Sequence, residues 1–174
     1  DSKVDILLKP VSIQPKYVNQ INISGNSRTL DKVVRREVVF AEGDAINSDL
    51  IRITKRNLDS LGIFKSVKID ETYLNDNLLD IDIYVEEKST GEFQIGLSFG
   101  TLEGATFISG LKEKNIAGLG REIDLTINTS DDNTKYNFGL IEPIVFNNNR
   151  LNFIYGISYE ENDYSSSASY NLNS

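Results

Sequence analysis

The sequence contains no cysteine, histidine, methionine or tryptophan. Without cysteine and histidine the chain has no thiol nucleophile, no Ser-His pair and no nitrogen or sulfur ligand for a zinc site. The missing cysteine also excludes a disulfide framework. The adjacent acidic pairs Glu86-Glu87 and Glu160-Glu161 lie at predicted strand ends, where neighbouring side chains point to opposite faces. We therefore predict a protein that is not an enzyme and that uses no cofactor or metal.

The sequence also lacks a long apolar run and an excess of positive charge. No stretch of ~18 apolar residues is present, which excludes a membrane-spanning helix, whereas a spanning β-barrel leaves no such run and stays possible. The 18 basic and 26 acidic side chains give a net charge of −8, which argues against nucleic-acid binding, because that rests on neutralised phosphates. The chain begins Asp1-Ser2, which indicates a processed or excised piece.

The two halves of the chain differ in composition. Residues 1–90 hold 3 of the 12 glycines and 5 of the 16 aromatic residues, and residues 91–174 hold the other 9 glycines and 11 aromatic residues. The first half has 13 basic and 15 acidic side chains, against 5 and 11 in the second. This shift predicts a domain boundary near Ser89-Thr90-Gly91.

The first half alternates strand and helix patterns. Residues 17–23 alternate as a strand and stop at a Gly-Asn turn. A first helix is predicted to start at Thr29, and a second at Asn47 or Ser48, ending before Gly62. Residues 65–73 and 78–87 are predicted to form a hairpin with one wet face. The predicted buried positions are Leu30, Val33, Val34, Val38 and Ala41 in the first helix, and Leu50, Ile51, Thr54, Leu58 and Leu61 in the second.

This order predicts an α+β fold, β-α-α-β-β, in which two helices cover one face of a three-stranded sheet. The pieces pack simply if the first strand pairs parallel with residues 78–87, which leaves residues 65–73 at an edge. Such an edge can accept a strand from another chain, and Lys65, Val67 and Ile69 would then form the binding edge. Alternatively, charged side chains at Lys65, Lys68 and Asp70 merely keep the edge soluble. The sequence leaves both possibilities open.

The second half is predicted to be strand after strand. Strands of about ten residues with alternating hydrophobicity and Asn, Asp, Ser or Gly turns are typical of a transmembrane β-barrel. A soluble antiparallel sandwich alternates in the same way, so the pattern alone leaves the choice open. Six strands do not close a sizeable barrel, and we expect open edges. The predicted strands are 91–100, 106–115, 121–128, 135–143 and 150–161, with a sixth in the terminal SSSASYNLNS.

Glu37, in Arg35-Arg36-Glu37, lies on the predicted apolar stripe of the first helix. A carboxylate does not stay ionised in a core without a partner. It either pairs with an arginine of this chain (Arg28, Arg35 or one from the second helix) or is offered to an arginine of another protein.

Two other motifs have plain explanations. Gly118-Leu119-Gly120 resembles part of a phosphate loop, but the third glycine is replaced by Ile123 and a strand follows, so a tight turn is predicted. Asp131-Asp132-Asn133 lacks the glycine and glutamate that complete a calcium loop, which predicts a solvated hairpin tip.

Four motifs cluster in the first half: Gly25-Asn26-x-Arg28-Thr29, Arg35-Arg36-Glu37, Glu42-Gly43-Asp44 and Leu61-Gly62-x-Phe64. Together they resemble the last POTRA domain of the BamA family of outer-membrane β-barrel assembly proteins. The segments EEKSTGEFQIGLSFGTLEGATF, KNIAGLGRE and LIEP look like that family's junction into its first barrel strands. The resemblance covers about residues 1–160. It assigns 1–15 to the last strand of a preceding POTRA domain and a linker, 16–90 to the POTRA domain and 91–174 to incomplete N-terminal barrel strands.

The resemblance implies a component of the machinery that folds and inserts β-barrel proteins into the outer membrane of a Gram-negative bacterium. The POTRA part would lie in the periplasm, and the implied partners are accessory lipoproteins, unfolded β-barrel clients and outer-membrane lipid, with no nucleic acid. Glu37, and less directly Arg36, would contact an accessory lipoprotein. The first barrel strand would open as a lateral gate, helped by glycines that weaken pairing. The gate residues are Phe93, Ile95, Gly96, Leu97, Phe99 and Gly100.

Two other functions fit the same patterns. One is a two-partner secretion pore, which also combines POTRA domains with a barrel and exports one dedicated protein. The other is a soluble periplasmic binding module with a β-sandwich tail.

Overall fold

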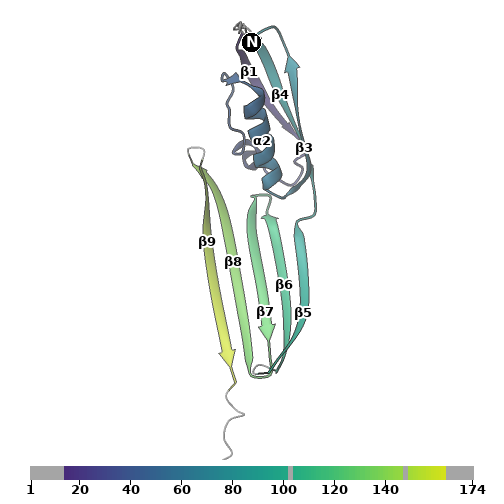
Figure 1. Ribbon diagram of the computed structural model, residues 1–174, viewed down its shortest axis with the longest axis vertical. Coiled ribbons are helices and arrows are strands. Elements are labelled where there is room, and N and C mark those ends of the chain that lie inside the picture. Colours follow the sequence, from purple (N-terminus) through teal and green to yellow (C-terminus); the bar gives the residue numbers. More distant parts are fainter. Residues whose placement is uncertain (1–13, 102–103, 147–148, 164–174) are drawn as a thin grey trace, which may run out of the picture.

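The computed structural model describes residues 14–101, 104–146 and 149–163, arranged as two sheets end to end (Figure 1). The predicted sixth strand at the C-terminus lies outside these residues. So does most of the segment 1–15 that was assigned to a preceding domain. Within the described ranges, no helix is long and apolar enough to cross a membrane.

The first unit (residues 16–87), which we call the POTRA unit after the resemblance in its sequence, has the two helices and the three longer strands in the predicted order. Its sheet has the order β2-β1-β4-β3. β1 runs parallel to β4, and β3 pairs antiparallel with β4 and forms an edge, as predicted. The elements are β1 (Lys16–Ser24), α1 (Asp31–Arg35), β2 (Ala45–Ile46), α2 (Ser48–Ser60), β3 (Phe64–Tyr73) and β4 (Leu78–Glu87).

One strand of this sheet was not predicted. β2 pairs antiparallel with the start of β1, through Lys16↔Ile46 and Tyr17↔Ala45. The sheet therefore has four strands rather than three. A two-residue strand is too short to show the period-two alternation from which strands are predicted.

α2 forms as predicted. The side chain of Asn47 accepts a hydrogen bond from the backbone N–H of Leu50 at 3.0 Å, which caps the first turn. Thr54 and Leu58 are fully buried. Gly62 has φ of +68°, the left-handed conformation that ends a helix.

α1 is shorter than predicted. It spans only Asp31–Arg35, and its N-cap position is Leu30, not Thr29, with no side-chain cap. Leu30 is 44% exposed and Ala41 is exposed, so neither belongs to a buried stripe. β-branched residues such as Val38 and Val39 disfavour a helical conformation. The helix ends at Arg35, before it reaches them.

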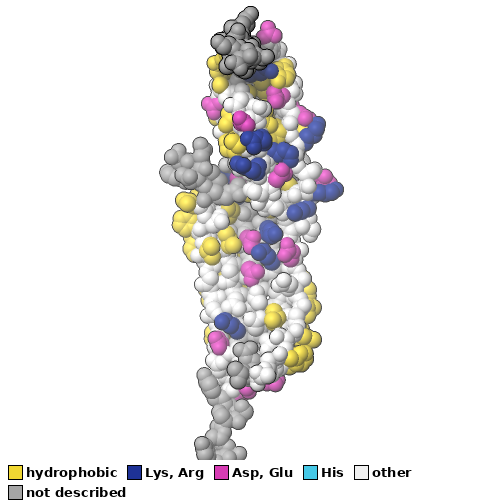
Figure 2. All heavy atoms as spheres, in the orientation of Figure 1, with side chains coloured by type: hydrophobic (Ala, Val, Ile, Leu, Met, Phe, Trp, Pro, Cys, Tyr) yellow, Lys and Arg dark blue, Asp and Glu magenta, His cyan; other side chains and the backbone are white. Residues whose placement is uncertain are grey.

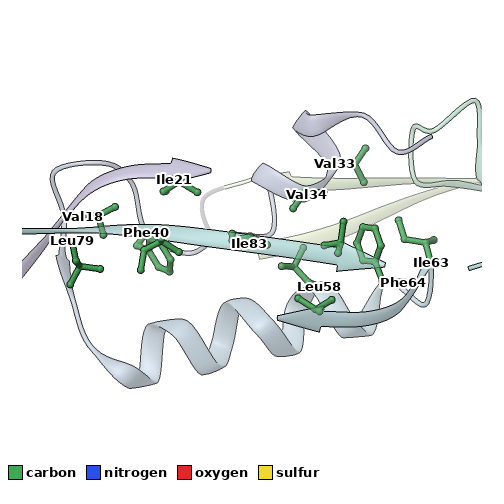
Figure 3. Close-up of a cluster of buried hydrophobic side chains, with 13 residues drawn as sticks. Val18, Ile21, Val33, Val34, Phe40, Leu58, Ile63, Phe64, Leu79 and Ile83 are labelled. Atoms are coloured by element: carbon green, nitrogen blue, oxygen red, sulfur yellow. The ribbon is translucent and has the colours of Figure 1, made fainter. Parts of the chain in front are cut away.

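The core of the POTRA unit forms between the sheet and the helices (Figure 3). Phe40, which follows the end of α1, is 6% exposed and packs into this core. Every buried hydrophobic side chain of the described residues lies in this unit, so the unit has a core of its own. The members are Val18, Ile21, Val33, Val34, Phe40, Leu58, Ile63, Phe64, Val67, Leu79, Ile81, Ile83 and Val85.

The second unit is one antiparallel sheet of the order β5-β6-β7-β8-β9. Each strand pairs with its neighbour along the chain, as in a meander, and β5 follows β4 after a short connection (Figure 1). The strands are β5 (Gly91–Gly100), β6 (Gly104–Ile116), β7 (Arg121–Thr129), β8 (Asn133–Phe146) and β9 (Asn149–Asn162). The predicted turns at Gly118-Leu119-Gly120 and around Asp131-Asp132 connect β6 to β7 and β7 to β8.

Candidate functional site

The two faces of the five-stranded sheet carry different kinds of side chain. On one face, a row of directly paired residues runs across all five strands. Its side chains are apolar, and each residue is between 38% and 71% exposed. The next row along the strands is polar or glycine. The apolar row is Phe93, Leu111, Leu125, Phe138 and Ile157, and the polar row is Gln94, Gly110, Thr126, Asn137 and Ser158.

The polar face also carries ion pairs. Nζ of Lys112 lies 2.7 Å from a carboxylate oxygen of Glu122, and Nζ of Lys114 lies 3.5 Å from Glu92. Figure 2 shows charged side chains on the sheet near the POTRA unit, and hydrophobic side chains along both flanks. In a sandwich the apolar face would pack on a second sheet, but the described part of the chain contains no layer that covers it. A sheet with one polar face and one apolar face is typical of the wall of a membrane β-barrel.

β5 forms one open edge of this sheet. It pairs with β6 over its whole length, from Gly91↔Glu113 to Gly100↔Gly104, and the described residues place no strand on its other side. The predicted gate residues therefore share one edge strand. Its four large apolar side chains, Phe93, Ile95, Leu97 and Phe99, are between 65% and 81% exposed.

β3 forms one edge of the sheet in the POTRA unit, but it is not a regular edge throughout. Phe64 pairs with Glu87 and Ser66 with Glu86, so Lys65 is the extra residue of a β-bulge. Val67 is buried in the core and Ile69 packs against it. A bulge interrupts regular pairing, so a continuous edge begins only at Ser66.

Glu37 is buried and forms an internal ion pair. It is 2% exposed, and Oε1 lies 3.4 Å from Nε of Arg36. The arginine of this ion pair is its immediate neighbour Arg36, which was not among the predicted candidates Arg28, Arg35 or an arginine of α2. The two side chains meet because the chain leaves the helix at Arg36, whereas consecutive residues of a helix diverge.

Arg36 also reaches the second unit. Its Nη1 donates a hydrogen bond to the backbone oxygen of Pro143 in β8 at 3.3 Å. The Arg36–Glu37 pair therefore joins α1 to the five-stranded sheet.

Glu87, at the end of β4, holds the loop before α1. Its carboxylate accepts hydrogen bonds from the backbone N–H of Thr29 at 2.6 Å, the N–H of Arg28 at 3.0 Å and the hydroxyl of Ser27 at 2.8 Å. Burial opposes ionisation of this side chain, but hydrogen bonds from Thr29, Ser27 and Arg28 outweigh it and lower the pKa of Glu87 from 4.5 to about 2.

The same loop contacts the turn between β6 and β7. The backbone N–H of Leu30 donates to the backbone oxygen of Gly118 at 2.9 Å. Nδ2 of Asn115 donates to Oγ1 of Thr29 at 2.9 Å, and Oδ1 of Asn115 accepts from the N–H of Gly120 at 2.8 Å. The predicted helix cap at Thr29 is therefore a contact between the two units.

Sequence reasoning missed Glu87 and Asn115 as site residues. Glu87 was noted only as one of two adjacent acids. Asn115 lies 86 residues from Thr29 in the sequence, so no local pattern links them. In the described ranges, no group of three or more histidine, cysteine, aspartate or glutamate residues is placed to hold a metal ion.

Comparison with known proteins agrees with this architecture. A POTRA family model, described as "Surface antigen variable number repeat", matches residues 16–88. The chain is 30% identical over 135 residues to the outer membrane protein assembly factor BamA of Buchnera aphidicola, covering 76% of this chain and 22% of that protein. It is 32% identical over 138 residues to a putative outer membrane protein assembly factor of Treponema pallidum, covering 76% and 16%.

Solved structures extend the likeness across both units. The crystal structure of BamA from Haemophilus ducreyi lacking POTRA domains 1–3 matches with a TM-score of 0.76 at 28% identity, over 87% of this chain and 29% of that chain. Over most of its length the chain is similar to proteins of the BamA family. CdiB from Acinetobacter baumannii matches with a TM-score of 0.62 at 17% identity, over 84% of this chain and 29% of that chain, which is a likeness of fold alone.

The chain spans about a fifth of the curated BamA relatives, 22% of one and 20% of another from Neorickettsia risticii. Similarity to these proteins covers both units together, the segment that matches the POTRA family model and the strands whose two faces differ in polarity.

Proposed function

We propose that this chain is part of a protein that assembles β-barrel proteins in the outer membrane of a Gram-negative bacterium. The observation that carries this proposal is the sheet with one apolar face and an open first strand, joined directly to a POTRA unit. Its relatives are named as outer membrane protein assembly factors. The proposed work needs no chemical step, only binding and strand pairing.

We place the five-stranded sheet in the wall of an outer-membrane barrel, with the POTRA unit in the periplasm. The apolar row would face lipid, which provides the covering that the row lacks within the described residues. In this proposal residues 91–174 are the first barrel strands, residues 16–90 the POTRA domain, and 1–15 the end of a preceding POTRA domain and a linker.

The proposed gate is β5, with Phe93, Ile95, Leu97 and Phe99 on its lipid face. An edge strand has free backbone donors and acceptors on its outer side, which can pair with an incoming client strand. Gly96 and Gly100 have no side chains to pack, which lowers the cost of separating β5 from a closing strand.

The proposed first contact for client strands is the edge of β3. Val67 and Ile69 lie on the regular part of this edge and Lys65 in the bulge. We propose that a client pairs from Ser66 towards Tyr73, and that the bulge at Lys65 ends the pairing.

The proposed surface for an accessory lipoprotein is α1 with its Arg36–Glu37 pair. Because Glu37 is buried, its carboxylate acts by holding the Arg36 guanidinium and the end of α1 in place. The partner would then contact the exposed side of α1, where Asp31 and Arg35 form a surface ion pair.

The experiment that tests the function uses the full-length protein, reconstituted in phospholipid vesicles with its accessory proteins and an unfolded β-barrel client. We expect the client to fold faster, as measured by protease protection and by heat-modifiable migration on gels. Depletion in the source bacterium should lower the amounts of many outer-membrane barrels together. Loss of only one secreted protein would indicate the secretion pore instead.

A further inference from the structure

The turn between β6 and β7 is built to fit against the POTRA unit. Three of its residues, Ala117, Gly118 and Gly120, have positive φ angles of 54°, 70° and 63°. This conformation is unfavourable for residues with a side chain, and glycine adopts it freely. The turn thus has an unusual backbone, and its two glycines lie where it meets the other unit.

Both glycines are in close contact with the segment that contains α1. A Cβ on Gly118 would lie 2.0 Å from the backbone oxygen of Arg28, and one on Gly120 would lie 2.8 Å from Nη2 of Arg36 and 3.0 Å from Cγ1 of Val33. At Gly118 the obstacle is backbone, which cannot move aside by a rotamer change. No other residue type fits at Gly118 while the two units stay together.

Specific hydrogen bonds reinforce this fit. Leu30 donates its backbone N–H to Gly118, and Asn115 connects Thr29 to Gly120 through both ends of its amide. Thr29 is 2% exposed, so its hydroxyl is paired away from water. While the units stay docked, removing the Asn115 amide would leave this buried oxygen without that hydrogen bond, which is costly.

We infer that the β6–β7 turn is a docking surface whose occupant is segment 28–36 of the same chain, and that Asn115, Gly118 and Gly120 are positioning residues. They fix the direction of the POTRA unit relative to β6, and therefore relative to β5, which pairs with β6 along its length. The β3 edge is then held in a set orientation to the β5 edge. The use of that orientation in client transfer rests on the proposed function, but the docking itself does not.

The test measures orientation in the full-length protein in lipid nanodiscs. Spin labels are attached to cysteines placed at Arg56, on the exposed side of α2, and at Ser98, on the polar face of β5. This chain has no cysteine of its own. Electron–electron distance measurements then report the distribution of separations between the two units.

We expect one narrow distribution in the unmodified protein. Gly118→Ala should broaden it and shift its maximum, and Gly120→Ala should do so less, because the end of the Arg36 side chain can move. Gly62→Ala is the matched control, since Gly62 has nearly the same φ, +68°, but a Cβ there meets nothing within 4 Å. It should leave the distribution unchanged.

Asn115→Ala removes the connecting amide without adding bulk and provides a second variant if Gly118→Ala does not fold. It should also broaden the distribution. Unchanged distributions in both Gly118→Ala and Asn115→Ala would overturn the inference, and so would equal broadening in Gly62→Ala. Client folding is measured on the same samples. Intact docking with no assembly activity would refute the proposed function alone.

Discussion

Nε of Arg36 lies 3.4 Å from Oε1 of Glu37, and Nη1 of the same guanidinium donates to the backbone oxygen of Pro143 at 3.3 Å. One side chain thus links a buried carboxylate of the POTRA unit to a strand of the five-stranded sheet. This link determines how substitutions of Glu37 should change the stability of the POTRA unit.

Glu37→Lys should destabilise the POTRA unit. It places a second cation next to Arg36 at a position that is 2% exposed, and uncompensated buried charge costs on the order of 3–5 kcal/mol. Glu37→Gln should cost less, because it removes the ion pair without adding repulsion. Urea unfolding of residues 16–90, which have their own core, measures both free energies. If Glu37→Lys keeps the parent stability but loses the lipoprotein in a pull-down, the carboxylate contacts the partner directly.

Glu87 should make the stability of the POTRA unit depend on pH in the acid range. Folding lowers the pKa of this carboxyl from 4.5 to about 2, so its contribution is present above pH 4.5 and is lost as the pH falls towards 2. The shift corresponds to about 3 kcal/mol. Glu87→Gln should lower the free energy of unfolding by about that amount at pH 7 and by little near pH 2.

The control for Glu87 is its neighbour Glu86, which lies on the exposed face and pairs with Lys65. Glu86→Gln should change the stability little at any pH, because surface ion pairs contribute little. Equal acid sensitivity of the parent protein and Glu87→Gln would show that Glu87 is not the group responsible.

Leu125→Lys should impair insertion into lipid, whereas Thr126→Lys should not. The two residues are adjacent in β7 and lie on the apolar and polar faces respectively. A lysine facing lipid at the middle of the bilayer costs about 2–4 kcal/mol, whereas one facing the lumen is tolerated. Urea titration of the full-length protein in phosphatidylcholine vesicles measures the difference. Similar losses in both variants would contradict the assignment of the faces.

A client strand should form a disulfide with a cysteine at Lys68 but not with one at Tyr84. These residues are directly paired on the same exposed face, with Lys68 on the edge strand β3 and Tyr84 on the inner strand β4. An added strand lies about 4.8 Å from β3 and twice as far from β4, and disulfides form only between adjacent strands at such spacing. Oxidation with a single-cysteine client peptide, followed by gel electrophoresis, tests this. Equal yields at the two sites would argue against strand addition at β3.

The fold was largely predictable because its elements carry strong local signals. β4 alternates Leu79, Ile81 and Ile83 with polar residues, and all three are fully buried. Asn47 and Gly62 mark the ends of α2 as predicted. The parallel pairing of β1 with β4 followed from the order of the elements. α1 was predicted poorly, because a stretch of valines fits both a helix and an irregular segment that packs on a core.

The sequence by itself determined the two halves and the alternation within the strands of the second half, because these depend on composition and short-range periodicity. It placed Glu37 on an apolar stripe, but it left open whether this carboxylate pairs within the chain or is offered to another protein. Only the tertiary structure decided that Arg36 pairs with Glu37. The same holds for the backbone N–H of Thr29, which donates to Glu87, and for its hydroxyl, which accepts from Asn115. The tertiary structure also decided that the Gly118-Leu119-Gly120 turn fits against the POTRA unit. Those contacts join segments up to 107 residues apart, and their partners are set by how two units dock, which no local pattern encodes.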